Sequence, residues 1–172
     1  MEELFETFSE EGEPTGLVAR DVVHKLGLWH RASNVFLFRT DGQLVVQRRH
    51  GTKDVWPGAW DLSVAEHLEP GESFVAGAIR GLSEELGITG VTLKPVSNVI
   101  RTKLEVAEQG IKDFEFQVCF RGVSDADVRP QTSEVAEIRL FRLDDLRAEM
   151  LRRPENFTPW FRSRASDIGL FR

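Results

Sequence analysis

The segment Ser73–Leu86 predicts one long helix that the rest of the chain has to accommodate. Pro70-Gly71 interrupts the chain before it, and Gly87 stands where a left-handed C-terminal cap is expected. Its apolar residues recur at helical spacing: Val75, Ala78, Ile79, Leu82 and Leu86. We therefore expect this stripe to form the buried face of the helix.

The part of the chain before this helix predicts two hairpins. Glu3–Phe8 and Leu17–Val23 flank a turn-rich stretch and are expected to pair. Val35–Phe38 and Leu44–Gln47 are expected to pair across Asp41-Gly42, because glycine adopts a positive φ without steric cost.

The part after the helix predicts strands at Phe114–Phe120 and Glu137–Phe141 and helices at Leu143–Leu151 and Asn156–Arg164. Strands interrupted by a central helix and closed by terminal helices indicate an α+β fold, an α/β/α sandwich on a mixed sheet. No repeat or long linker divides the sequence, so we expect residues 1–172 to form a single domain.

The charge balance narrows the classes of function. A formal net charge of −6 argues against general nucleic-acid binding, which depends on neutralising backbone phosphates. It leaves room for a small phosphorylated ligand. No apolar run approaches the ~20 residues of a membrane span, and the acidic N-terminal residues are unlike a secretory signal. With Cys119 as the single cysteine, we expect a cytoplasmic protein.

The predicted helix also carries chemistry. Helical geometry places Gly77, Gly81, Glu84 and Glu85 together beside the apolar stripe. Two glycines in a helix cost about 1 kcal/mol each relative to alanine, and adjacent glutamates repel each other. A divalent cation and a phosphate chain would explain both features, since the cation removes the repulsion and the glycines leave room. The alternative is a solvated acidic face.

The stretch Glu66–Ile88 resembles the Nudix box, G-x5-E-x7-R-E-U-x-E-E-x-G-U, where U is a bulky apolar residue. The matching residues are Glu72, Arg80, Leu82, Glu84, Glu85, Gly87 and Ile88. The resemblance implies a Nudix hydrolase in which Glu84 and Glu85 bind the metal. It also implies that Glu72 and Arg80 form a brace that positions the loop before the helix.

Two positions depart from the box. Its first glycine is Glu66 here, and the glutamate after the arginine is Gly81. In the family that second glutamate commonly ligates a metal or helps to activate water, so its loss leaves the general base open. Glu66 is either a compensating carboxylate or an ordinary surface side chain.

Outside the box the chain resembles isopentenyl-diphosphate isomerase, which has a Nudix fold, over about residues 24–162. The shared residues include Arg48-Arg49, Lys53, Trp56-Pro57-Gly58, Trp60, Ser63-Val64, His67, Gly71-Glu72 and Phe157-Thr158-Pro159-Trp160-Phe161. The resemblance implies that Arg49 and Lys53 hold a substrate diphosphate, and charge-assisted hydrogen bonds suit that role. The alternative is an ordinary charged strand end and loop.

The isomerase reaction itself is not expected. The position of its catalytic cysteine is Ala65, and Cys119 lies inside a predicted strand, where we expect a small buried hydrophobe. The helix also has Glu84, where the isomerase lacks one of the paired glutamates. The pattern is that of the isomerase-like branch of Nudix hydrolases.

A possible second metal site follows from the same resemblance. His24, His30, His67 and Glu115 fall on or near positions that hold a second metal in the isomerase. Imidazoles and a carboxylate suit zinc or manganese. The alternative is that these histidines hydrogen-bond neighbouring loops without a metal.

Together these resemblances imply an Mg²⁺-dependent hydrolase, with Mn²⁺ as an alternative ion, that cleaves a P–O–P linkage in a nucleoside di- or triphosphate or a related derivative. Glu134, just before a predicted strand, is the candidate general base, and Glu137 is the alternative. We expect a small phosphorylated substrate as the partner and no membrane association. The rival functions are isomerase, opposed by Ala65, and a catalytically silent nucleotide-binding module, suggested by Gly81.

Overall fold

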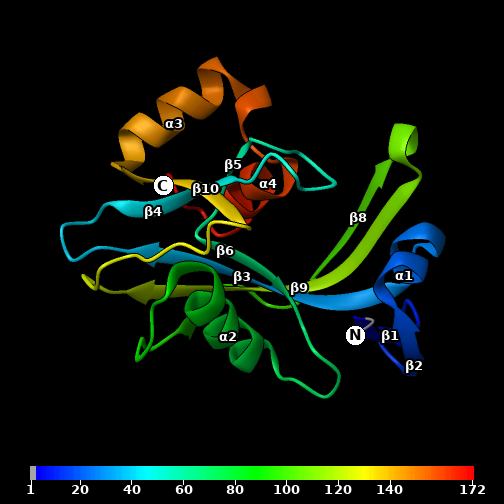
Figure 1. Cartoon of the computed structure of the whole chain (residues 1–172). Coiled ribbons are helices and arrows are strands. Elements are labelled where there is room, and N and C mark those ends of the chain that lie inside the picture. The colour runs from blue at the N-terminus through cyan, green and yellow to red at the C-terminus, as the bar shows by residue number, and fades with distance from the viewer. Residues whose placement is uncertain (1–2) are drawn as a thin grey trace.

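Strand β3 (Trp29–Phe38) runs through the centre of the sheet, and the other strands are arranged around it (Figure 1). The computed structural model describes residues 3–172. In it β3 pairs in parallel with β9 (Ile111–Val123) along its whole length. β6 (Val64–His67) pairs antiparallel with the other edge of β3. The sheet is therefore mixed, as predicted.

The remaining elements complete three layers. The other strands are β1 (Leu4–Phe8), β2 (Pro14–Ala19), β4 (Leu44–Arg49), β5 (Trp60–Asp61), β7 (Lys94–Pro95), β8 (Ile100–Val106) and β10 (Val135–Phe141). The helices are α1 (Arg20–Leu26), α2 (Phe74–Leu86), α3 (Leu143–Arg152) and α4 (Pro159–Asp167), with 3-10 turns at Ala107–Gln109 and Pro154–Asn156. α2 lies on one face of the sheet and α3 and α4 on the other (Figure 1), which confirms the predicted sandwich.

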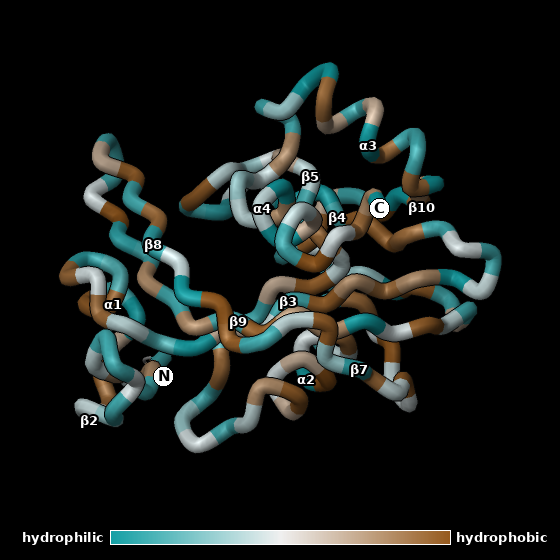
Figure 2. Tube along the Cα trace, turned by 180° about the vertical axis from the view of Figure 1, so that it is seen from behind, coloured by the Kyte–Doolittle hydropathy of each residue, from teal (hydrophilic) through white to brown (hydrophobic). Residues whose placement is uncertain are grey.

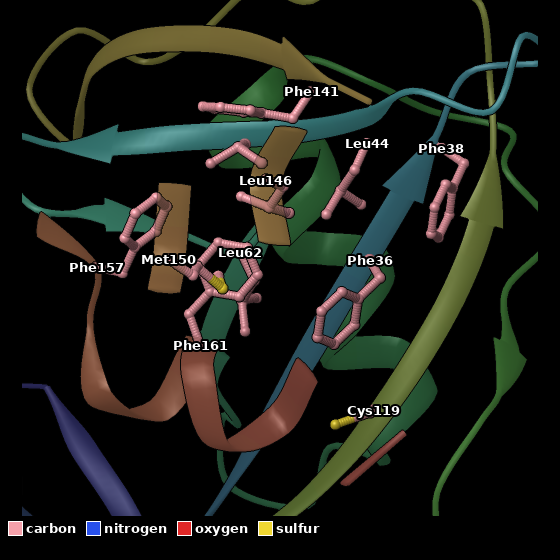
Figure 3. Packing of buried hydrophobic residues seen from close by; sticks show 11 residues of the cluster. Phe36, Phe38, Leu44, Leu62, Cys119, Phe141, Leu146, Met150, Phe157 and Phe161 are labelled. Atoms are coloured by element: carbon pink, nitrogen blue, oxygen red, sulfur yellow. The ribbon is translucent and has the colours of Figure 1, made fainter. Parts of the chain in front are cut away.

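The side chains of β3 alternate between two cores. Val35 and Leu37 join the cluster beneath α2. Phe36 and Phe38 face the opposite layer, where Phe36 packs with Phe161 of α4 (Figure 3). Because both faces of the strand are buried here, its last four residues, Val35–Phe38, form a continuous apolar run rather than an alternating one.

Helix α2 begins and ends as predicted but buries a different face. The Ser73 side chain accepts a hydrogen bond from the Ala76 N–H, and Gly87 ends the helix in a left-handed conformation. The buried residues are Gly77, Ala78, Gly81, Leu82, Glu85 and Leu86. Val75 and Ile79 are 41% and 48% exposed. The prediction that they belong to the buried face is therefore wrong, whereas Ala78, Leu82 and Leu86 are buried as predicted.

The two helix glycines bring α2 close to the sheet. A Cβ added at Gly81 would lie 2.6 Å from Val64 Cγ1 and 3.0 Å from Glu66 Cβ. A Cβ added at Gly77 would lie 3.0 Å from Leu68 Cδ1. The expectation that these glycines leave room for a cation and a phosphate chain is therefore wrong. They leave room for side chains of β6 and of the residue that follows it.

Both predicted hairpins exist, with different extents. β1 and β2 pair, but residues 20–23 begin α1 instead of extending the second strand. The Asp41-Gly42 turn joins β3 and β4, with Gly42 at φ 85. These strands pair only at Phe38 and Leu44. Beyond that point β4 pairs with β5 and β10, and β6 occupies the edge of β3.

Several elements were not predicted, namely α1, β5, β6, β7 and β8, and one helix begins later than expected. Among them, β8 pairs with β9 from Ile100 to Val106. The β8–β9 hairpin projects from the sheet with alternating hydropathy (Figure 2), which is the pattern of a strand with one wet face. The predicted helix Asn156–Arg164 begins only at Pro159, with Thr158 as its N-cap.

Replacing Gly81 with Ala should lower the free energy of unfolding. The gain in helix propensity is about 1 kcal/mol, whereas overpacking of a tight core costs about 1–3 kcal/mol. Because the new methyl would lie 2.6 Å from Val64 Cγ1, we expect a net loss in urea or thermal unfolding. Gly51→Ala, where a Cβ meets open space, is the matched control and should change little. A Gly81→Ala protein more stable than the wild type would contradict this packing.

Candidate functional site

A cavity of about 490 Å³ lies between β4, β6, α2 and the loop before β10, within the size range of ligand pockets. Predicted site residues that line it are His24, Arg49, Lys53, His67, Arg80, Glu84, Glu85, Glu115 and Glu134. Glu72 and His30 do not line it, but each contacts a residue that does. Residues from nearly the whole length of the chain, from Glu3 to Trp160, therefore line this one cavity.

Glu85 is the buried carboxylate of this cavity. It is 9% exposed, and Gln47 donates a hydrogen bond of 2.7 Å to its Oε2. Burial raises the pKa of Glu85 to about 8, and the negative charges of Glu66 and Asp61 add to that rise. A buried carboxylate without a compensating charge is costly, and a divalent cation would offset the cost.

Arg80 joins the helix to the loop before it. Its Nε and Nη2 donate to the two oxygens of Glu72 at 3.1 and 2.9 Å, and Nη2 also donates to the His67 carbonyl at 2.7 Å. Its Nη1 lies 3.2 Å from Glu84 Oε2 and 3.4 Å from Glu66 Oε1. The hydrogen bonds to Glu72 raise the pKa of Arg80, so the guanidinium stays charged. The contact predicted between Arg80 and Glu72 is present.

The two predicted phosphate-binding cations are each paired with a carboxylate. Lys53 Nζ donates to Glu134 Oε2, so one predicted substrate ligand contacts the predicted general base. Arg49 Nη1 lies 3.3 Å from Asp61 Oδ2, and its guanidinium lies over the Trp160 ring. Burial lowers the pKa of Lys53. An incoming phosphate would compete with these carboxylates for the two cations.

The predicted histidines gather at another part of the cavity. His24, His30, His67 and Asp113 each offer one ligand atom, all within 4.8 Å of one another. His30 Nε2 lies 3.2 Å from Asp113 Oδ1, and His67 Nε2 lies 3.2 Å from Glu115 Oε1. Within residues 3–172, His24 Nε2, His30 Nε2 and Asp113 Oδ1 are buried atoms that lack a hydrogen bond of good geometry.

The chemistry of this cluster fits a divalent transition metal. Burial lowers the pKa of His24 and, more strongly, that of His67. At His30 burial is outweighed by the hydrogen bond to Asp113 and the charge of Glu115, which raise its pKa. Neutral imidazole is the form that binds metals. Buried polar atoms without partners are otherwise costly, and nitrogen and oxygen donors together suit zinc or manganese.

Several residues of the site were not predicted. Asp61 is 1% exposed and accepts a hydrogen bond of 2.9 Å from the Thr158 hydroxyl. Gln47, the partner of Glu85, was also missed. Asp113 shares a face of β9 with Glu115, so strand alternation would have found it had the strand been predicted to begin before Phe114.

The cavity offers no thiol among its described lining residues. Ala65 lines it at the position where the isomerase has its cysteine. Cys119 is fully buried in the core beside α4 (Figure 3), and burial raises the pKa of its thiol to about 11. The expectation that Cys119 is a buried hydrophobe is confirmed.

The chain is similar to a known domain family and to two kinds of curated protein. The NUDIX domain matches residues 28–161. Isopentenyl-diphosphate Delta-isomerase 2 of Photorhabdus laumondii is 30% identical, covering 94% of this chain and 90% of the relative. An uncharacterized Nudix hydrolase of Pseudomonas aeruginosa is 34% identical, covering 81% of this chain and 79% of the relative.

A solved structure shares the fold. The crystal structure of a Deinococcus radiodurans protein, DR0079, superposes with a TM-score of 0.69 at 22% identity, covering 87% of this chain and 90% of the other. Within residues 3–172, no helix is long and apolar enough to cross a membrane.

Proposed function

Because this chain belongs to the NUDIX domain family, we propose that it is a metal-dependent pyrophosphohydrolase formed by a single domain over residues 1–172. Its reaction is cleavage of a P–O–P linkage in a nucleoside di- or triphosphate or a related nucleoside diphosphate derivative. The observation that carries the proposal is the meeting of Glu84 and Glu85 with Arg49 and Lys53 around one cavity. An enzyme that cleaves a phosphate chain needs carboxylates to hold a metal ion and basic side chains to bind the phosphates, and this cavity has both.

The donor set at the end of α2 fits Mg²⁺, with Mn²⁺ as the alternative. Glu84 and Glu85 would hold the ion, which prefers a few carboxylates together with waters and phosphate oxygens. The fit rests on Glu85, a buried carboxylate whose charge a cation would stabilise. When bound, such an ion lowers the pKa of water and neutralises charge on the phosphates.

The other residues bind, position and accept a proton. Arg49 and Lys53 bind the phosphate chain through charge-assisted hydrogen bonds. Phosphate binding by Lys53 frees Glu134 from its ion pair, and Glu134 then accepts a proton from the attacking water. Glu72 and Arg80 keep the loop before α2 in place.

A second cation at the histidine cluster belongs to the same proposal. His24, His30 and His67, with Asp113 or Glu115, supply nitrogen and oxygen donors close to the cavity. Zinc or manganese is the ion that this mixture favours. The supporting observation is that, among residues 3–172, the buried Nε2 atoms of His24 and His30 lack a hydrogen bond of good geometry.

A second candidate function is isopentenyl-diphosphate isomerisation. It is favoured by the 30% identity to an isomerase over 94% of this chain. Ala65 and the burial of Cys119 oppose it, because no thiol of the described residues lines the cavity to act as the acid. Hydrolysis needs no thiol, so we prefer it.

Substrate turnover is the direct measurement of this function. We expect release of phosphate or pyrophosphate from nucleoside di- or triphosphates, dinucleoside polyphosphates or nucleotide sugars when Mg²⁺ or Mn²⁺ is present. Glu85→Gln should lower turnover by more than about tenfold, or ~1.4 kcal/mol of barrier, because an amide lacks the charge that the cation needs.

The same assay separates the rival functions. Isomerisation of isopentenyl diphosphate without hydrolysis of any diphosphate would favour the second candidate. Nucleotide binding without turnover of any substrate would favour a catalytically silent module.

Glu134→Gln should lower kcat by roughly 10²–10⁴-fold, the usual effect of removing a general base, and leave the metal dissociation constant unchanged. Activity of the variant should recover as pH rises, because hydroxide then forms without help. Glu137→Gln is the matched control, since Glu137 contacts Arg48 on the exposed side of β10. A pH–rate profile in which only Glu137→Gln is impaired would move the base to that residue.

His24→Ala should weaken binding of zinc or of cobalt as its spectroscopic substitute. The expected loss is at least tenfold, since even partners outside the ligand set contribute about 10–100-fold to metal affinity. His50→Ala is the control, because His50 bonds the Thr52 hydroxyl away from the cluster. Equal metal retention after dialysis in all three proteins would show that the cluster is not a metal site.

A further inference from the structure

Asp61 is a buried carboxylate that joins two sides of the cavity. It lies on β5, which pairs with β4, and it lines the cavity although it is only 1% exposed. β5 is also tied to the segment before α4, because Trp60 forms a bridge with Phe157 (Figure 1). Asp61 therefore lies where the strand that carries Arg49 meets the helix that carries Trp160.

Both oxygens of this carboxylate accept hydrogen bonds. Oδ1 accepts bonds of 2.9 Å from the Leu62 N–H and the Thr158 hydroxyl, and one of 2.8 Å from the Trp160 indole N–H. Oδ2 lies 3.0 Å from the same indole nitrogen and 3.3 Å from Arg49 Nη1. Burial raises the pKa of Asp61, and the charge of Arg49 is the largest influence against that rise. A buried carboxylate needs such a partner, because its charge is otherwise uncompensated.

The contacts of Arg49 leave one nitrogen of its guanidinium for a ligand. Nε donates to the Val55 carbonyl at 3.1 Å, Nη1 donates to Asp61, and Cζ lies 5.1 Å from the centroid of the Trp160 ring. Among residues 3–172, Nη2 has no hydrogen-bond partner. Because a guanidinium is rigid and planar, fixing two of its nitrogens also fixes the direction of the third. Nη2 is therefore oriented before a ligand arrives.

We propose that Asp61 is a positioning residue for phosphate binding, which holds Arg49 in the orientation in which Nη2 receives a phosphate oxygen of the substrate. This inference rests on the proposed function, which assigns the phosphate chain to Arg49 and Lys53. The two cations then differ in how they are held, since Glu134, the partner of Lys53, is 41% exposed, whereas Asp61 is enclosed. A side chain that is oriented before binding loses less conformational entropy when the ligand binds.

The competing explanation is that Asp61 only stabilises the packing of α4 through Thr158 and Trp160. Asp61→Asn separates the two explanations, because it keeps the shape of the side chain and one oxygen. That oxygen can still accept the three hydrogen bonds made to Oδ1, so the fold should persist. The amide nitrogen then takes the place of Oδ2 and faces Arg49 Nη1. Two donors cannot bond each other, so Arg49 loses its anchor.

Thr158→Val is the matched control for this change. It removes one partner of Asp61 and the side-chain cap of α4, but it leaves the contact between Asp61 and Arg49 intact. Loss of a cap destabilises a helix, so we expect a lower thermal midpoint. Binding of phosphate should stay like that of the wild type.

The experiment is calorimetric titration, in the presence of Mg²⁺, with methylenediphosphonate, a diphosphate analogue whose P–C–P linkage resists hydrolysis. We expect Asp61→Asn to weaken its binding by at least about tenfold, since a misplaced binding group can cost roughly 10²-fold. Removing a negative charge from the cavity would by itself strengthen the binding of an anion. The sign of the change therefore distinguishes lost positioning from a general electrostatic effect.

A double-mutant cycle tests whether the effect of Asp61 passes through Arg49. In an Arg49→Ala background, Asp61→Asn should cause no further loss of affinity, because the group that it positions is absent. Arg49→Lys gives a second test that leaves Asp61 unchanged. It keeps the positive charge but has no planar group to orient, so it should also weaken binding.

Each other outcome overturns a defined part. If Asp61→Asn binds methylenediphosphonate like the wild type or more tightly, this inference fails, and the proposed function still stands on the hydrolysis assay. Equal weakening in Thr158→Val, or an undiminished effect of Asp61→Asn in the Arg49→Ala background, would show that Asp61 acts through packing and would also reject positioning. If the wild type binds no methylenediphosphonate, the proposed phosphate site at Arg49 fails, and this inference fails with it.

Discussion

The close approach of α2 to β6 is the constraint on which the rest of the site depends. Without a side chain at Gly81, the helix lies closer to Val64 than a Cβ would permit, and at Gly77 a Cβ would make a tight contact with Leu68, 3.0 Å from its Cδ1. Overpacking such a contact is destabilising, so the glycines fix how α2 is rotated about its axis. That rotation turns Glu85 toward the cavity.

The rotation has an electrostatic consequence. It buries Glu85 beside Gln47 and leaves Glu84 half exposed, so two adjacent glutamates have different environments. Burial holds the pKa of Glu85 near 8, whereas Glu84 contacts Arg80. The cavity is therefore a place where a cation would relieve a cost that the fold has already imposed.

Opposite charges elsewhere in the cavity are paired with each other. Arg49 contacts Asp61, and Lys53 contacts Glu134. Such pairs keep the charged side chains ordered and satisfied, and a phosphate chain would exchange one anionic partner for another. Arg80 has a structural role instead, because its rigid guanidinium contacts Glu72 in the loop and Glu84 in the helix at the same time.

The sequence determined what depends on local chemistry. The limits of α2 follow from Ser73 and Gly87, and the mixed sandwich follows from the order of apolar segments. Ala65 excludes a thiol at its position from sequence alone. The residues expected around the cavity were identified mainly through resemblance, and nearly all of them line it or contact its lining.

Only the tertiary structure decided which face of α2 is buried and which residues meet across the chain. The spacing of apolar residues predicted a buried stripe that included Val75 and Ile79, which are exposed. Such spacing carries no information on how closely a strand can approach each face of the helix. Lys53 and Glu134 are 81 residues apart in the sequence and meet only in the folded chain. Their contact depends on the sheet topology, in which β4 pairs with β3 only at Phe38 and Leu44 and otherwise pairs with β10. Strand pairing is non-local, so no single segment of the sequence specifies it.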